Sequence, residues 1–412
     1  MSQTSCTSKP KALTLDQAVA RLIQAVQPLT ETETVALADA LGRVLAEPVR
    51  SAIDVPPWDN SAMDGYTIRI SDLAASGGCL PIAQRIPAGH MGEPLALGTA
   101  ARIFTGAPIP DGADTVVIQE VCRESAGEVQ IPLDIQVGAN IRRRGEDIRE
   151  GSTVLAAGTR LSPQHLGLAA SIGCSALQVY RRLRVAILTT GDEIVEPGVP
   201  LQQGQIYNSN WYLLAGLLRH WGCEVLDLGI VHDDLGATVA ALNQASKADL
   251  IIASGGASVG DKDHLRPAVE QLGQLEFSEI RIRPGKPVAF GRVGQTPILG
   301  CPGNPVSLFV TALLFARPLI RRLQGIDPDH PPRLLPVRAA FDWPKPDRRM
   351  EFHRARLVRL EDGELGVEVY PSRSSAVLSS VVWADGFVQL EPERVLQRGD
   401  RVEFLPFSEL LS

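Results

Sequence analysis

The sequence predicts a multidomain α/β and β protein built around a mostly parallel sheet with helices on both faces. Three observations predict this fold class. The chain has 412 residues, more than one hydrophobic core usually organises. Between residues 181 and 328, apolar strand patterns alternate with helical patterns, which is typical of a parallel sheet. The regions on either side carry short apolar runs broken by Pro and Gly, which favour strands and turns.

The first element is an amphipathic helix that begins after Thr14. Thr14 and Gln17 form a capping-box pattern, and apolar residues then recur at helical spacing up to Pro28. From residue 51 to 147 the pattern changes to short apolar runs with turns such as Pro56-Pro57 and Gly77-Gly78. We therefore expect a separate β-rich domain inserted at residues 51–147.

Strands and helices then alternate through residues 181–328. The predicted strands are 183–190, 224–230, 250–254 and 297–300, and the predicted helices are 211–220, 238–247, 265–272 and 305–323. After a proline-rich linker at 325–336, alternating apolar and polar residues predict a small β domain that we assign to residues 329–412. In sheets of this kind, ligands bind beyond the carboxyl ends of the strands, so the loops there are the candidate site.

The loop SGGASVGDKDH, residues 254–264, follows one of these strands. Its glycines can aim backbone N–H groups at an anion, which makes Ser254, Gly255, Gly256 and Gly260 candidates for phosphate binding. Asp261 stands where a Walker A loop needs Lys, so ATP hydrolysis of that type is disfavoured. The alternative is a turn whose glycines serve only positive φ angles.

Acidic residues at the same strand ends indicate a Mg²⁺ site. Asp263 lies in the glycine-rich loop, and Glu193 and Asp233 follow two other strands. Magnesium takes one or two carboxylates together with phosphate oxygens of a substrate. For Asp233 and its neighbour Asp234, a helix N-cap is an equally good interpretation.

Two further loops complete the candidate site in this region. Arg281, Arg283 and Lys286 surround a Pro-Gly-Lys-Pro turn and form a candidate oxyanion site, with a solvated basic strand edge as the alternative. In CPGNPVS, Asn304 and Pro305 have the pattern of a helix start, while Gly303 would allow close approach of a ligand.

Two motifs outside this region also carry clustered charges. In IRRRGEDI, Arg142 and its neighbours stand against Glu146 and Asp147 across one glycine; a salt-bridged domain boundary or a phosphate site with a general base would explain this. The string DVPPWDNSAMDGY, residues 54–66, has no helical or strand periodicity. An ordered surface loop accounts for Asp64-Gly65 better than for the whole string with Asp59.

The composition excludes several classes of protein. The net charge of -7 argues against general nucleic-acid binding, and no apolar run is long enough to span a membrane, so we expect a cytoplasmic protein. The six cysteines show no CxxC pair, which argues against a zinc or iron–sulfur site and favours reduced thiols.

Taken together and in order, these motifs closely resemble the molybdopterin molybdenumtransferase family, represented by bacterial MoeA and the E domain of gephyrin. The resemblance runs through PPWDNSAMDGY, IFTGAPIP, RRRGEDI, LTTGDEI, SGGASVGD, RPGKP and PGNPVS. It implies that residues 181–328 form a molybdopterin-binding α/β domain, that residues 329–412 form a β-barrel, and that residues 12–50 with 148–180 form an elongated dimerisation domain.

The resemblance also implies the activity. A homodimer would insert molybdate, a substrate, into adenylyl-molybdopterin with Mg²⁺-dependent release of AMP, after an upstream molybdopterin adenylyltransferase has made that substrate. The active cleft would combine catalytic residues of one subunit with binding residues of the other. The first set is Asp59, Thr105, Arg142 and Asp147; the second includes Glu193, Asp233, Asp263, Arg283 and Lys286, and Arg354 and Ser375 are further cleft residues.

Two other functions stay open at this point. The preceding adenylation step uses the same α/β fold, but it needs only the 181–325 region, whereas this chain carries further domains. A scaffold is the other alternative, because the E domain of gephyrin also clusters receptors; the retained acids and cations argue against a purely structural role.

Overall fold

The computed structural model describes residues 12–255, 264–277, 279–327 and 331–411. Within the described ranges, contacts divide the chain into two compact units: residues 12–33, 42–46 and 179–411 form the larger unit, and residues 34–41 and 47–178 form the smaller one. The four domain ranges expected from the sequence remain a prediction. No helix in the described ranges is long and apolar enough to cross a membrane.

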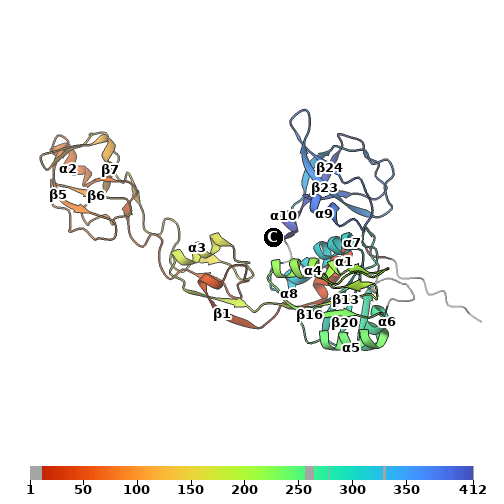
Figure 1. Cartoon of the computed structure of the whole chain (residues 1–412). Coiled ribbons are helices and arrows are strands. Elements are labelled where there is room, and N and C mark those ends of the chain that lie inside the picture. Colours follow the sequence, from red (N-terminus) through yellow and green to blue (C-terminus); the bar gives the residue numbers. More distant parts are fainter. Residues whose placement is uncertain (1–11, 256–263, 278, 328–330, 412) are drawn as a thin grey trace, which may run out of the picture. The chain divides into compact units, whose positions relative to one another are not determined.

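A six-stranded sheet forms the centre of the larger unit, with strand order β16-β13-β17-β21-β20-β18 (Figure 1). Pairing is parallel from β16 to β21 and antiparallel for β20 and β18. The strands are β13 (Arg184–Thr190), β16 (Glu224–Val231), β17 (Leu250–Ser254), β18 (Gly273–Phe277), β20 (Ala289–Val293) and β21 (Thr296–Cys301). The predicted mostly parallel sheet is therefore confirmed.

Helices cover both faces of this sheet because its central strands are apolar on both faces. On β13, Val185 and Ile187 belong to one buried cluster, and Ala186 and Leu188 belong to another. The first cluster packs against α1 (Leu15–Ala25), α4 (Ser209–His220), α7 (Pro305–Thr311) and α8 (Arg317–Leu323), and the second against α5 (Leu235–Ala245) and α6 (Leu265–Leu272). Buried Val, Leu and Ile side chains contribute roughly 1.5–3 kcal/mol each.

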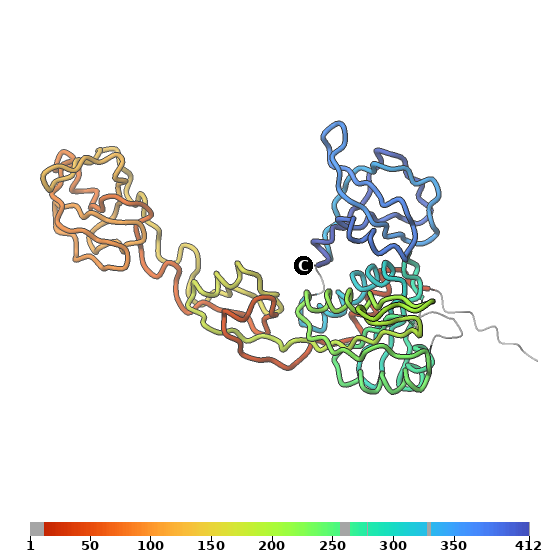
Figure 2. The backbone as a smooth tube through the Cα atoms, in the orientation of Figure 1, coloured from red at the N-terminus to blue at the C-terminus, as the bar shows by residue number. Residues whose placement is uncertain are grey.

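The first helix joins this core from the other end of the sequence. Thr14 and Gln17 form the predicted capping box, and Ala18 and Leu22 are fully buried. Figure 2 shows the red segment of α1 lying against the cyan segment that contains α8. Leu29 N–H then donates to Leu323 O at 2.8 Å, which holds the chain after α1 against the end of α8.

Two sequence predictions in this region were incomplete. The helix expected at 238–247 begins earlier, at Leu235, because the Asp234 carboxylate accepts the Ala237 N–H at 2.8 Å and caps it. The antiparallel strands β18 and β20 were not predicted; they pair with each other although the charged Pro-Gly-Lys-Pro segment separates them in the sequence. Residues 305–323 are helical as expected, with a π-helical segment at Ala312–Ala316 between α7 and α8.

The C-terminal region forms the small β-barrel that the resemblance implied. Strand β23 pairs with both β24 and β25, and the pairs β24–β22, β22–β26 and β26–β25 complete a closed ring. The elements are β22 (Leu335–Ala339), β23 (Met350–Arg359), β24 (Leu365–Val369), β25 (Gly386–Leu390), β26 (Arg401–Pro406), α9 (Ser379–Trp383) and α10 (Phe407–Leu411). The short strand β19 (Ile282–Arg283) pairs with β23 and attaches the barrel to the α/β region.

The smaller unit is rich in β-structure, as predicted. Its main sheet has strand order β7-β4-β6-β5-β9-β8 and packs around Tyr66, Ile68 and Leu80. These strands are β4 (Gly65–Ile68), β5 (Cys79–Ile86), β6 (Ala100–Ile103), β7 (Thr115–Ile118), β8 (Arg123–Ser125) and β9 (Glu128–Gln130). Further elements that lie wholly or partly in this unit are β1 (Thr32–Ala36), β2 (Val49–Arg50), β3 (Asn60–Ser61), β10 (Ile141–Arg142), β11 (Thr153–Leu155), β12 (Ala176–Tyr180), α2 (Ile70–Ala75) and α3 (Pro163–Ser171). The cysteines in the described ranges form no disulfide with one another.

An ion pair holds the starts of β13 and β17 together. The Asp249 carboxylate accepts from the Arg181 guanidinium at 2.6 and 2.8 Å and from the Arg184 N–H at 2.7 Å. Burial alone would raise the pKa of Asp249, but the hydrogen bonds from Arg181 and Arg184 outweigh it and hold the pKa below its ordinary value of 3.8. The charged form therefore stabilises the fold.

We expect Asp249→Asn to lower the free energy of unfolding at pH 7 by about 1–3 kcal/mol, because it removes the mostly buried charge that pairs with Arg181 and leaves only the exposed Glu31 as its charged partner. Because the folded-state pKa is lowered, the contribution is present above the ordinary value and is lost as the pH falls below it. Denaturant melts at pH 7 and below pH 4 check both effects. Glu270→Gln, which breaks an exposed pair with Arg266, is the control and should cost under about 0.5 kcal/mol. An equal loss in both variants would contradict the assignment.

Candidate functional site

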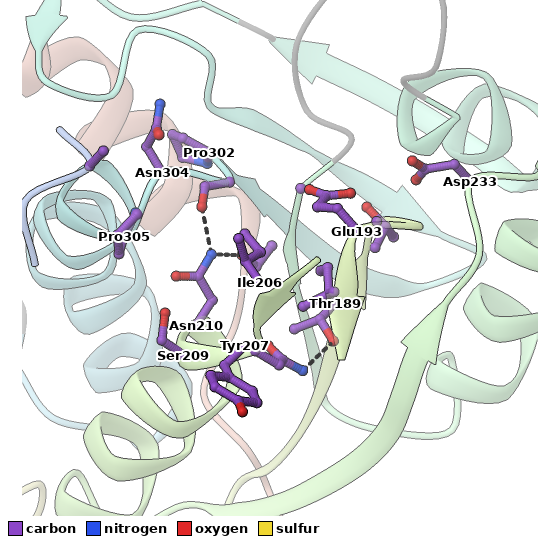
Figure 3. Close-up of a pocket in the computed structure, with 18 of the residues that line it drawn as sticks. Thr189, Glu193, Ile206, Tyr207, Ser209, Asn210, Asp233, Pro302, Asn304 and Pro305 are labelled. Atoms are coloured by element: carbon purple, nitrogen blue, oxygen red, sulfur yellow. Dashed lines mark hydrogen bonds between the residues drawn. The ribbon is translucent and has the colours of Figure 1, made fainter. Parts of the chain in front are cut away.

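A cavity of about 740 Å³ lies at the carboxyl ends of the parallel strands (Figure 3). Strand β13 ends at Thr190, β17 at Ser254 and β21 at Cys301, and all three continue into loops that line this cavity. Parallel strands end at the same edge of their sheet, so loops far apart in the sequence converge there. The cavity therefore lies where the sequence analysis placed the site.

One end of the cavity carries two acidic side chains. Glu193 follows β13 and Asp233 follows β16, and Figure 3 shows both on the same side of the cavity. The two neighbouring aspartates have different roles, because Asp234 caps α5 while Asp233 lines the cavity. The predicted third acid, Asp263, lies outside the described residues, as do Gly256 and Gly260.

The other end of the cavity is built from amides, glycines and prolines. The Asn210 Nδ2 group donates to Ser254 Oγ at 2.9 Å and to Gly303 O at 2.7 Å (Figure 3). Asn304 and Pro305 begin α7 as expected, and both line the cavity. The structure thus brings Ser254, Gly255 and Gly303, three predicted binding residues, into one wall.

Gly255 occupies a position that requires glycine. Its φ angle is +96°, and a Cβ atom there would lie 2.7 Å from both Thr190 O and Thr190 Oγ1. Its N–H donates to Cys301 O at 3.2 Å. The loop after β17 therefore lies directly against the end of β13, where a side chain would leave no space.

The cations of the RIRPGKP segment do not line this cavity. Arg283 pairs with Asp347 at 2.8 Å and lies 3.9 Å from Glu351, and Lys286 pairs with Glu279 at 3.3 Å. Arg281 is exposed, and only Pro287 of the segment reaches the cavity wall. The sequence predicted that these three cations face a ligand, but none of them lines the cavity. Arg283 instead lies beside acidic side chains on and just before the barrel strand β23.

Arg354 and Ser375 occupy different positions beside the site. Arg354 is 1% exposed, and its guanidinium donates to Ser380 Oγ, Ser372 O and Ser374 O. Arg354 therefore supports the loop instead of facing the cavity. Ser375 O accepts the Val306 N–H at 3.0 Å, which holds Ser375 against the start of α7, and the next residue, Ala376, lines the cavity.

In the smaller unit, Asp59 is held by two arginines. Its carboxylate accepts from Arg143 Nη1 at 2.6 Å and from the Arg144 N–H at 2.8 Å. Partial burial would raise the pKa of Asp59, but these two hydrogen bonds outweigh it and hold the pKa below its ordinary value. Asp59 is thus an ionised and oriented acid, and a weak proton acceptor.

The other predicted residues of this unit, Arg142, Asp147 and Thr105, lie in loops that contact the 54–66 loop. Arg142 and Asp147 are exposed, and the Arg142 backbone pairs with Asn60 through β10 and β3. The Asp64 carboxylate accepts from Thr105 N and Thr105 Oγ1, both at 2.8 Å, and the Thr105 N–H bond lowers the pKa of Asp64. Asp64 therefore ties the 54–66 loop to the 103–110 loop, a role beyond that of a turn residue.

Family models match nearly the whole chain. The MoeA N-terminal region (domain I and II) matches residues 13–173, the probable molybdopterin binding domain matches residues 186–322, and the MoeA C-terminal region (domain IV) matches residues 336–407. A molybdopterin molybdenumtransferase of Haemophilus influenzae is 40% identical over 97% of this chain and 100% of the relative. The chain belongs to the molybdopterin molybdenumtransferase family.

Other members support the assignment to this family. Molybdopterin molybdenumtransferase 2 of Mycobacterium tuberculosis strain H37Rv is 39% identical over 92% of this chain and 94% of the relative. The crystal structure of the molybdopterin biosynthesis moeA protein from Pyrococcus horikoshii OT3 matches 96% of this chain and all of its own, with a TM-score of 0.82 and 27% identity. The expected transferase role in molybdenum cofactor biosynthesis is confirmed.

Two asparagines of the cavity, Asn208 and Asn210, were not predicted from the sequence. Asn208 and Asn210 begin α4, and Thr189 and Tyr207 line the same wall. The string YNSN before an apolar helix resembles an ordinary N-cap, and Asn208 does accept the Trp211 N–H at 3.2 Å. The sequence signal that could have indicated the cavity was the second asparagine, Asn210, because one asparagine is enough to cap the helix.

We expect Gly255→Ala to reduce turnover roughly tenfold to a hundredfold, because the added Cβ displaces the cavity wall. Gly198→Ala is the matched control: Gly198 has a φ of +98°, but no heavy atom lies within 4 Å of its added Cβ. Steady-state kinetics and thermal melts of both variants separate backbone strain from the clash. Equal turnover in the two variants would exclude a role for close packing at Gly255.

Proposed function

We propose that the cavity at the strand ends binds adenylyl-molybdopterin, and that this chain inserts molybdate into it with Mg²⁺-dependent release of AMP. The observation that supports this most is the division of the cavity into an acidic end, with Glu193 and Asp233, and a glycine-lined end, with Gly255 and Gly303. The acidic end fits a phosphoanhydride with a bound cation, and the glycine-lined end lets the backbone approach a ligand closely.

The acidic end fits Mg²⁺ by its chemistry. Glu193 and Asp233 offer carboxylate oxygens, the ligands that Mg²⁺ prefers. The described residues contain no cluster of three or more His, Cys, Asp or Glu that would close a metal site on its own. Magnesium commonly completes its shell with substrate phosphates and water, so two protein acids suffice. The bound ion would neutralise the charge of the phosphoanhydride.

The residues of the chain would then orient the substrate and limit the access of water. The loops after β17 and β21 would hold the substrate through their backbone groups, and the cavity would keep its phosphates beside Glu193. A water oxygen would attack phosphorus, the phosphoanhydride P–O bond would break, and AMP would leave while molybdopterin keeps its own phosphate and the proton passes to solvent. The two dithiolene thiols of the pterin would bond to molybdenum and lose their protons, which leave with one molybdate oxygen as water, so the cysteines of the chain are not needed as ligands.

Asp59 and Asp147 would orient the oxygen nucleophile, and Arg142 would steady the phosphates, with Thr105 nearby in the loop that Asp64 holds. The lowered pKa of Asp59 favours orientation over proton abstraction for that residue. Arg281, Arg283 and Lys286 would act on the oxyanion, which for Arg283 requires release from Asp347. A homodimer completes the proposal, with each cleft combining residues of two copies, as the sequence resemblance implies.

We expect Glu193→Gln and Asp233→Asn to raise the Mg²⁺ concentration needed for half-maximal AMP release by roughly tenfold or more, because each removes one charged oxygen ligand. Assays contain adenylyl-molybdopterin, molybdate and varied Mg²⁺. Asp234→Asn is the control, since it removes the adjacent charge while Asn preserves the cap of α5. The proposal fails if both variants keep the wild-type Mg²⁺ dependence. Consumption of ATP with release of pyrophosphate and formation of adenylyl-molybdopterin from metal-free molybdopterin would assign the adenylation step instead.

We expect Asp59→Ala and Asp147→Ala each to lose about 10²-fold or more of AMP release under the same conditions, because oriented acids contribute on this scale. Asp59→Ala and Glu193→Gln are then mixed under conditions that exchange subunits, at a Mg²⁺ concentration too low to support turnover by Glu193→Gln alone. Part of the activity should be restored, because half of the clefts in the mixed dimers would be intact. Light scattering of each pure variant checks that it assembles like the wild type. Wild-type turnover in both aspartate variants would refute their assignment.

A further inference from the structure

Asn210 connects two loops of the cavity wall that come from different strands. Its Nδ2 group donates to Ser254 Oγ at the end of β17 and to Gly303 O after β21, at 2.9 and 2.7 Å. A carbonyl oxygen only accepts, so the nitrogen of the amide must face Gly303 and the orientation of the side chain is determined. Asn210 thus acts as a strut between the two loops.

The two loops lie close together on either side of this strut. A Cβ atom on Gly303 would lie 3.9 Å from the Gly255 Cα, and the Gly255 N–H donates to Cys301 O. Ser254, Gly255 and Gly303 all line the cavity. The spacing of this glycine wall therefore depends on contacts that Asn210 makes directly.

The other half of the Asn210 amide has no partner. Its Oδ1 atom is buried and accepts no hydrogen bond within the part of the chain that the structure describes. Figure 3 shows this oxygen turned away from both hydrogen bonds of the nitrogen. A buried acceptor without a partner is costly, so the two bonds made by Nδ2 bring little net stability.

Asn208, two residues earlier, differs in this respect. Its Nδ2 group donates to Thr189 Oγ1 at 3.1 Å and to Glu196 Oε1 at 3.2 Å, and its Oδ1 atom accepts the Trp211 N–H. Both halves of this amide have partners, and Asn208 is 2% exposed. Asn208 is therefore built into the fold, whereas Asn210 contributes little to stability while it holds the cavity wall.

We propose that Asn210 is a positioning residue for the substrate: it sets the distance between the loops of Gly255 and Gly303 and thereby the affinity for the phosphate-bearing substrate. This inference rests on the proposed function, since it assumes that the substrate binds against this wall. Asn210 acts through the two loops, and its own oxygen is not a ligand for the substrate.

The first test compares stability with affinity. Asn210→Ala should leave the melting temperature close to that of the wild type, because the loss of two hydrogen bonds is offset by removal of the unpaired oxygen. Its KM for adenylyl-molybdopterin should rise about tenfold, with a smaller change in kcat. Asn208→Ala should lower the melting temperature clearly. Asn243→Ala, an exposed asparagine on α5, is the control for both measurements and should match the wild type.

The second test separates the nitrogen from the oxygen. Asn210→Asp keeps an oxygen in the cavity wall but cannot donate to Gly303 O, so its KM should rise as in Asn210→Ala. A wild-type KM in Asn210→Asp would overturn the proposal and assign the oxygen as a substrate contact. A melting temperature that falls in Asn210→Ala as far as in Asn208→Ala, with KM unchanged, would show a structural role only.

Hydrogen exchange measured by mass spectrometry tests the strut without any substrate. Peptides that contain Gly255 and Gly303 should exchange faster in Asn210→Ala than in the wild type, and peptides from α5 should not change. Unchanged exchange at both loops would refute the strut itself. Faster exchange with an unchanged KM would refute the link between this wall and the substrate. If the wild-type protein releases no AMP from adenylyl-molybdopterin, the proposed function is refuted instead.

Discussion

Burial of β13 and β17 on both faces is the constraint on which the larger unit depends. Every residue of β17 is buried, and alternate side chains of β13 enter two separate clusters. A strand of this kind needs helices above and below it, and helices between parallel strands provide them. This requirement brings four strand ends to one edge of the sheet, where the loops are free of the core and can form a cavity.

At two positions, the loops at this edge pack closely in arrangements that do not favour folding. Gly255 has a backbone conformation that side chains rarely adopt and lies against Thr190, and Asn210 keeps an unpaired oxygen in a buried position. Neither arrangement is favourable for folding alone. Local choices that reduce stability are common at functional sites, and here they occur together along one wall of the cavity.

The barrel adds a second network of charges beside the α/β region. Glu351 is 2% exposed, accepts from Arg373 and lies near Arg283, and the Asp347 carboxylate pairs with Arg349 and Arg283. Hydrogen bonds from Arg349, followed by Arg283, outweigh burial and hold the pKa of Asp347 far below its ordinary value. Together with the pairing of β19 and β23, these contacts attach the barrel to the segment that carries Arg283 and Lys286. A predicted ligand-binding cation is therefore also part of the attachment.

The sequence by itself determined the parallel strands of the α/β sheet, the β-rich region, the small C-terminal β domain and the loops that line the cavity, because hydrophobic periodicity and Pro and Gly residues at turns are local properties. Capping by Thr14 and the helix start at Asn304-Pro305 were predictable for the same reason. Only the tertiary structure decided which of these groups meet. It separated Asp233 from the cap Asp234, paired Arg283 with Asp347 and joined Asn210 to two distant loops. These contacts join residues up to 93 positions apart in the chain, so periodicity and local spacing carry no information about them.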